Sequence, residues 1–189
     1  MMQIDIQPLQ WLENHMVYSK DHPVRLVGGR LALDLVNTAD WSADDQVVQE
    51  KIADFEDLEV WLRSLELETV EPPRSIAAFH ALRRDLRAFM RSDGTFQSPH
   101  LRAALGSLRQ AERYTDQSLT ALATMSAISI MADPRERDRI KMCPGVDCGW
   151  LFIDETRNSR RTWCHMETCG NKAKAARHYE KVRRDRSKT

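Results

Sequence analysis

Long apolar runs are missing from this sequence, because charged residues interrupt each hydrophobic stretch within a few positions. The first fifteen residues also lack the basic and apolar regions of a signal peptide. We therefore expect no membrane span, no export signal and a cytoplasmic location. Gly and Pro number only seven each, and 42% of the residues are hydrophobic, which excludes collagen-like, low-complexity and disordered classes. A chain of 189 residues can build a substantial core.

A net charge is also absent, but the two parts of the chain are not neutral. Residues 1–133 contain 13 Lys and Arg against 20 Asp and Glu, whereas residues 134–189 contain 15 against 8. An acidic body followed by a basic segment predicts two domains, 1–133 and 134–189, with different tasks. The alternative is that the basic segment is only a solvated tail.

Cysteine is scarce, and all four cysteines lie in the basic segment. Two C-x4-C pairs are separated by a 15-residue spacer and consist of Cys143, Cys148, Cys164 and Cys169. Two close pairs on two tight turns are the arrangement that holds one tetrahedral Zn²⁺ ion. An ion with four thiolate ligands has no open position for water, so we expect a structural zinc and not a catalytic one. Unligated thiols or transient disulfides are the alternative.

The segment around the cysteines predicts a small zinc-binding fold. Residues 139–142 are expected to be extended, and residues 150–153 and 161–163 to form two short strands joined by a polar turn. A helix is predicted from Asn171 onward, directly after the last cysteine pair. This order of turn, hairpin, turn and helix is typical of a treble-clef-like zinc finger.

The predicted final helix has two contrasting faces. Its basic face consists of Lys174, Arg177, Lys181 and Arg184, which are spaced i, i+3, i+7 and i+10. Its opposite face, with Ala175, Tyr179 and Val182, is expected to pack against the rest of the protein. The predicted DNA-binding surface combines the basic face with Arg160, Arg161, Asn171 and Lys172. A helix face that is merely solvated is the alternative.

Apolar spacing in residues 1–133 predicts a helical domain with a small β element. The expected helices span 55–65, 76–90, 101–108 and 119–131, with Pro72-Pro73 ending the first and Ser98-Pro99 preceding the third. After the turn at Gly28-Gly29, the apolar residues suit either a strand of a hairpin or a short helix. The expected fold class is therefore mainly α, with a C-terminal zinc finger.

Three short polar residues follow this glycine pair and are candidates for binding a small ligand: Asp34, Asn37 and Thr38. Side chains of this kind more commonly hold a loop in place through hydrogen bonds to the backbone. No catalytic triad, P-loop or dinucleotide fingerprint occurs in the sequence. We therefore do not expect an enzyme.

The cysteine-containing segment resembles a known family. Residues 143–181, CPGVDCGWLFIDETRNSRRTWCHMETCGNKAKAARHYEK, are similar to the CGNR zinc finger of bacterial transcription regulators. Residues 26–41, LVGGRLALDLVNTADW, resemble the opening of the ABATE domain that usually precedes this finger. Lys172 stands where the CGNR signature has arginine. Lysine keeps the positive charge but lacks the planar guanidinium that can donate two parallel hydrogen bonds.

This resemblance implies a transcription regulator. Its finger would bind DNA, and its N-terminal domain would sense a small-molecule effector or form a homodimer. The alternative function is a zinc-stabilised protein-interaction module without DNA binding. RNA binding is disfavoured because few aromatic residues accompany the basic face.

Overall fold

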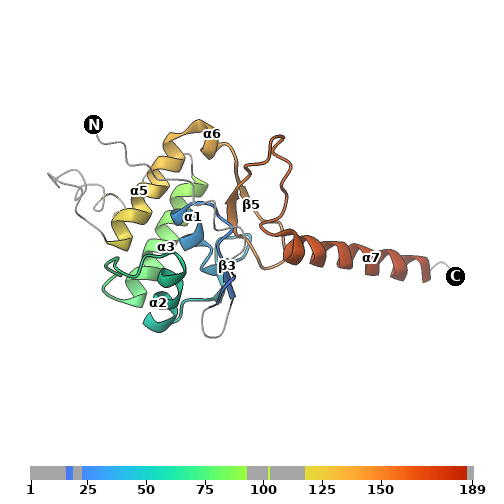
Figure 1. The fold of residues 1–189 in the computed structure, drawn as a ribbon. Helices are drawn as coiled ribbons and strands as arrows, with labels where there is room; N and C mark the ends of the chain where they lie inside the picture. Colours follow the sequence, from blue (N-terminus) through green and yellow to red (C-terminus); the bar gives the residue numbers. More distant parts are fainter. Residues whose placement is uncertain (1–15, 19–22, 93–101, 103–117, 187–189) are drawn as a thin grey trace.

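The structure is a computed structural model that describes residues 16–18, 23–92, 102 and 118–186, and these residues are mainly helical (Figure 1). The helices are α1 (Leu31–Val36), α2 (Phe55–Ser64), α3 (Ile76–Arg91), α5 (Leu119–Ala132), α6 (Pro134–Arg137), the π-turn η2 (Met166–Gly170) and α7 (Asn171–Arg186). The strands are β1 (Met16–Tyr18), β2 (Pro23–Arg25), β3 (Ala39–Trp41), β4 (Val47–Glu50), β5 (Ile140–Met142) and β6 (Leu151–Ile153). They pair as the antiparallel ribbons β1–β2, β3–β4 and β5–β6. The predicted mainly α fold with a C-terminal zinc finger is confirmed.

The described residues include no helix with both the length and the apolarity needed to span a bilayer. The helix predicted over residues 101–108 lies outside the described residues, as do Ser98 and Pro99.

Polar residues at their N-termini fix where the main helices begin. Asp54 Oδ1 accepts a hydrogen bond from the Asp57 N–H at 3.0 Å, and Ser75 Oγ accepts one from the Ala78 N–H at 3.1 Å. The end of α2 differs from the prediction, because the helix stops at Ser64, well before Pro72-Pro73. Glu66 adopts a positive φ of 54° there, so the chain leaves the helix through a left-handed residue and not through a proline.

The segment after the glycine pair forms a helix, α1, and not a hairpin strand. This short helix lies against α3 and α5, and Ala32, Leu33, Asp34, Leu35 and Val36 are all buried. A helix that is buried on all sides has no polar face, so its sequence shows no helical period. This is why the sequence alone left the two alternatives open.

The body and the finger share one hydrophobic core. Leu33 and Trp41 from the body belong to the same cluster of buried residues as Leu151 and Phe152 from the finger. The backbone continues this contact, since the Trp41 N–H donates to the carbonyl of Cys148 at 3.1 Å. The finger is therefore held against the body by packing and hydrogen bonds, and not by a flexible tether.

Two arginines of α3 connect the body to its hairpin and to the finger. The guanidinium of Arg87 stacks on Trp41 with its Cζ 4.4 Å from the ring centroid, and its Nη1 donates to the Gly149 carbonyl at 2.9 Å. Arg83 pairs with Glu50 of β4. Both guanidinium groups are buried and multiply hydrogen-bonded, which is what makes buried charge tolerable.

The hairpin of the finger pairs differently from the prediction. β6 pairs with β5, in the register Ile140↔Ile153, whereas residues 161–163 form no strand. The buried carboxylate of Asp154 takes the Arg161 N–H at 2.8 Å, and Lys141 Nζ donates to the Arg161 carbonyl at 3.1 Å. Side chains thus occupy the backbone groups of Arg161 that a second strand would use, and the prediction of strand pairing for 161–163 is wrong.

The helix α7 extends away from the rest of the protein (Figure 1). None of its residues is buried, and Tyr179 on its apolar face is 72% exposed. The expectation that the face with Ala175, Tyr179 and Val182 packs against the body is therefore wrong. The sequence pattern was that of an amphipathic helix, but no partner element of the described residues covers it.

The close contact between body and finger predicts a strong effect of a methyl group at Gly149. Its φ is +55°, and a Cβ there would lie 2.5 Å from the Trp41 carbonyl oxygen. Gly29 also has a positive φ, +79°, but a Cβ there would meet nothing within 4 Å. We expect Gly29→Ala to lower the free energy of unfolding by about 1 kcal/mol and Gly149→Ala by about 3 kcal/mol or more. Urea denaturation measures both, and equal effects would contradict the tight contact.

Candidate zinc centre and basic surface

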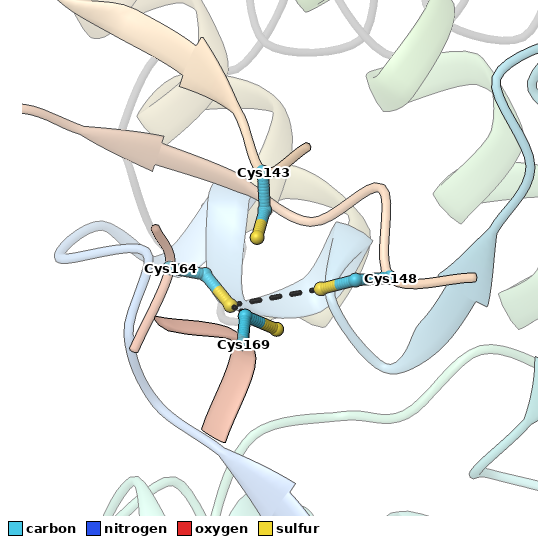
Figure 2. A group of neighbouring side chains, drawn as sticks. All are labelled: Cys143, Cys148, Cys164 and Cys169. Carbon is cyan, nitrogen blue, oxygen red and sulfur yellow. Dashed lines mark hydrogen bonds between the residues drawn. The ribbon is translucent and has the colours of Figure 1, made fainter. Parts of the chain in front are cut away.

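The four cysteine sulfurs converge on one point between the two turns of the finger (Figure 2). All four Sγ atoms lie within 4.8 Å of one another. Cys148 Sγ is 3.6 Å from Cys164 Sγ, which in turn is 3.7 Å from Cys169 Sγ. Cys143, Cys148 and Cys164 are buried, and Cys169 is half-buried at the entry to α7. The predicted set of ligands is thus brought together from the first turn, which directly follows β5, and from the segment before α7, where Cys169 lies in η2.

These distances and this donor set fit zinc. Sulfurs at about 2.3 Å from a tetrahedral Zn²⁺ ion are separated by about 3.8 Å, close to the observed separations. The first turn is shaped around the cluster, because a Cβ at Gly145 would lie 3.0 Å from Cys169 Sγ. The four cysteines form a site for one structural zinc ion, whose chemistry is to hold the two turns together.

The thiols influence one another strongly. Hydrogen bonds from Cys148 and Cys164 lower the pKa of Cys143 well below its usual range. The hydrogen bond with Cys143 in turn raises the pKa of Cys148 and of Cys164. Four thiolates at these distances repel each other, so a cation is needed to keep all of them ionised.

Asn37 joins the two halves of the protein. Its Nδ2 donates to the Leu151 carbonyl at 2.8 Å, and its Oδ1 accepts from the Leu151 N–H at 2.9 Å. The side-chain amide thus pairs with β6 as a neighbouring strand would. Asn37 is fully buried, so its position supports the alternative in which it holds the chain in place.

Asp34 and Thr38 are also buried and engaged within the body. Asp34 Oδ1 accepts from the Gly28 N–H at 2.7 Å, and burial raises the pKa of this carboxyl to about 7. Thr38 Oγ1 donates to the Leu35 carbonyl at 2.7 Å and accepts from Arg83. The three candidate ligand-binding residues therefore lie inside the core, and none of them lines the groove described below.

The two arginines before the second cysteine pair differ in position. Arg161 is half-buried: its guanidinium lies over Phe152, with its Cζ 4.3 Å from the ring centroid, and donates to the carbonyls of Cys164, Trp163 and Val27. Arg160 is exposed. Arg161 thus connects the finger to the body, and its donors point inward.

The helix α7 carries the remaining predicted DNA contacts. Lys174, Arg177, Lys181 and Arg184 are exposed along one stripe. Asn171 donates through Nδ2 to the Glu167 carbonyl at 3.2 Å, across the junction between η2 and α7. Lys172 is exposed, but at roughly 100° per residue it lies about 200° around the helix from Lys174, outside the stripe.

A groove of about 500 Å³ lies beside the zinc centre, between the body and the finger. Three of the zinc ligands, Cys148, Cys164 and Cys169, line it directly. The finger also contributes the rest of the first turn, Trp150, Trp163 and the start of α7 with Lys172. The body contributes Asp40, Gln49 and Lys51. The sequence analysis missed these three, because they come from β3, β4 and the residue after β4, and no spacing in the sequence links them to the finger.

The zinc site predicts a measurable effect of removing one ligand or the metal. We expect one zinc per chain in the purified protein and loss of the ion in Cys164→Ser, because three thiolates bind less tightly than four. Chelation should lower the melting temperature of the whole chain, since Cys148 shares a backbone hydrogen bond with Trp41. Elemental analysis and circular dichroism test this, with zinc re-addition as control. Full zinc occupancy in Cys164→Ser would contradict the four-ligand site.

The buried amide pair predicts that Asn37 is needed for stability. Asn37→Ala would leave the N–H and C=O of Leu151 without their partners, so we expect the free energy of unfolding to fall by about 2–5 kcal/mol. Asn158→Ala is the matched control, because Asn158 is exposed in the finger loop and should change stability by less than about 0.5 kcal/mol. Equal stability of the two variants in urea would contradict the role of the pair.

Comparison with known families agrees with this arrangement. Residues 139–182 match the CGNR zinc finger, and residues 29–134 match the ABATE family, whose description is "Putative stress-induced transcription regulator". No curated protein matches the chain. The first match begins five residues after the second ends, so they meet between α6 and β5. The chain therefore belongs to the ABATE family and carries a CGNR zinc finger that follows the ABATE region.

Proposed function

We propose that the protein is a transcription regulator that binds duplex DNA through α7. The observation that carries the proposal is a 16-residue helix that begins directly after the zinc centre and buries none of its residues. It contains seven Lys and Arg against two acidic residues. An exposed helix with this excess of positive charge is suited to a partner of the opposite sign.

Charge and shape together favour DNA as that partner. The stripe of Lys174, Arg177, Lys181 and Arg184 runs along the helix axis, as phosphates run along the edge of a groove. The exposed Arg160 of the finger loop adds a cation outside the helix. A single α-helix is about the width of the major groove, so an unpacked helix can enter it with all faces available.

The zinc centre supports the proposal mechanically. Cys169 directly precedes Gly170 and α7, so the ion fixes the first turn of the helix relative to the first cysteine pair. The finger is in turn held to the body by Asn37 and Arg87. A helix that is already positioned loses less conformational entropy when it binds DNA, which favours binding.

Salt dependence of binding tests the proposal. If about five cations reach phosphates, the logarithm of affinity for duplex DNA should fall with the logarithm of salt concentration with a slope of about −4 to −5. Arg177→Gln should make the slope shallower by about one and weaken binding to every sequence alike. Fluorescence anisotropy with labelled duplexes measures both.

The matched control is Arg63→Gln, because Arg63 is an exposed arginine of α2, outside the finger. It removes the same charge and should leave the slope unchanged. Binding that does not respond to salt, or that Arg63→Gln weakens as much as Arg177→Gln, would refute DNA recognition by α7.

A further inference from the structure

The groove beside the zinc centre has the size and composition of a small-molecule site. Its volume of about 500 Å³ falls in the range of roughly 300–1,000 Å³ that is usual for ligand pockets. Its walls are largely apolar, with the indoles of Trp150 and Trp163 and the side chains of Val146, Ala173 and Ala176. Asn37 and Arg87, which hold the body and the finger together, do not line the groove.

Lys51 brings a buried charge to this groove. Its side chain is only 7% exposed, and its Nζ donates to Asp40 Oδ2 at 2.9 Å. Asp40 Oδ1 in turn accepts a hydrogen bond from the Trp150 Nε1–H at 2.8 Å. An ammonium has three N–H donors, and within the described part of the chain Asp40 is the acceptor of one of them. The other N–H groups of Lys51 can donate to further acceptor atoms in the groove.

Lys172 supplies a second cation at the other wall. It lies in the first turn of α7, is exposed, and has no hydrogen-bond or ion-pair partner among the described residues. The acidic residues of the lining are Asp40, which is paired with Lys51, and the exposed Asp147. The four charged side chains of the lining sum to zero, and with Zn²⁺ bound the four thiolates add a net charge of −2, so a polyanion such as a nucleotide is disfavoured. Lys51 and Lys172 are the groups of the lining that can pair with a single carboxylate.

We propose that this groove binds a small, flat organic monoanion, with an aromatic ring against the two indoles and a carboxylate between Lys51 and Lys172. Aromatic rings stack well on indole, and the carboxylate satisfies donors that the protein leaves unused. The ligand would contact the body through Lys51 and α7 through Lys172, Ala173 and Ala176. The groove is therefore placed to act as an effector site, a role that rests on the proposed DNA binding.

The helix geometry allows effector and DNA to bind together. Lys172, Ala173 and Ala176 are the residues of α7 that line the groove. At roughly 100° per residue, their mean direction lies about 115° around the helix axis from the mean direction of the stripe of Lys174, Arg177, Lys181 and Arg184. The two ligands would thus contact different faces of one helix. Coupling between them would then be reciprocal, so that each changes the affinity of the other by the same factor.

Calorimetry on the full-length, zinc-loaded protein tests the site without DNA. The probe is naphthalene-2-carboxylate, and naphthalene-2-carboxamide is its uncharged counterpart of the same shape. We expect saturable binding of one carboxylate per chain and at least tenfold weaker binding of the amide. Absence of saturable binding of either compound, or equal affinities for the two, would overturn the proposal.

Two pairs of variants locate the site. Lys172→Gln should lower the affinity for the carboxylate about tenfold and leave the affinity for the amide unchanged. Lys174→Gln, which removes a neighbouring charge outside the groove, should change neither affinity. Ala176→Phe should fill the groove and abolish binding of both compounds, whereas Ala175→Phe on an exposed face outside the groove should not. Binding that survives Ala176→Phe, or that Lys174→Gln weakens as much as Lys172→Gln, would overturn the assignment.

The effector role is tested by repeating the DNA titration with saturating carboxylate. A change in DNA affinity of threefold or more, absent in Ala176→Phe, supports it, and an unchanged DNA affinity overturns it. Failure of DNA binding itself would refute the proposed function, and the calorimetric result would still decide whether the groove is a site.

Discussion

The side-chain amide of Asn37 pairs with both backbone groups of Leu151, and the relation between body and finger depends on this contact. β6 is three residues long, and within the described ranges β5 is its one strand partner. Its buried backbone groups on the other side must find partners within the protein, because no water reaches them. Asn37 provides these at the end of α1, and α1 itself is enclosed by α3 and α5. A finger too small to form its own core thereby uses the core of the body.

Buried charge is concentrated at the same junction. Arg83 and Arg87 of α3 reach the β3–β4 hairpin, and Arg87 also reaches the backbone of Gly149 in the first cysteine turn. From the other side, Arg161 of the finger reaches the Val27 carbonyl in the body. Each of these cations is tolerated because several oxygen atoms and an aromatic ring surround it. Such contacts are directional, so they orient the finger as well as hold it.

The orientation of the finger gives the first turn of α7 two neighbours. On one side is the zinc centre, and on the other is the groove to which the body contributes Asp40 and Lys51. Beyond this turn none of the described residues of α7 is buried. A ligand in the groove would therefore act on the part of α7 that the protein holds, and this is the physical basis of the proposed coupling between effector and DNA.

The spacing of the four cysteines by itself determined the zinc site. Each tight turn already places its two ligands close together, so the fold only has to bring the two turns into contact. The starts of α2 and α3 and the basic stripe of α7 were also readable, since each depends on neighbours within a few residues. The sequence did not decide whether α1 is a helix, because burial on all sides erases the period of its apolar residues.

Only the tertiary structure decided which polar residues lie in the core and which line the groove. Asp34, Asn37 and Thr38 have the composition of a binding cluster, yet the packing of α1 under the finger places all three inside the core. Lys51 and Asp40 have no recognisable motif, yet β3 and the end of β4 bring them to the groove with Lys172. Arg161 and Arg160 are neighbours of the same type, and the hydrogen bonds of Asp154 and Lys141 turn the first inward and leave the second exposed. Contacts between distant segments determine these positions, and local sequence carries no record of them.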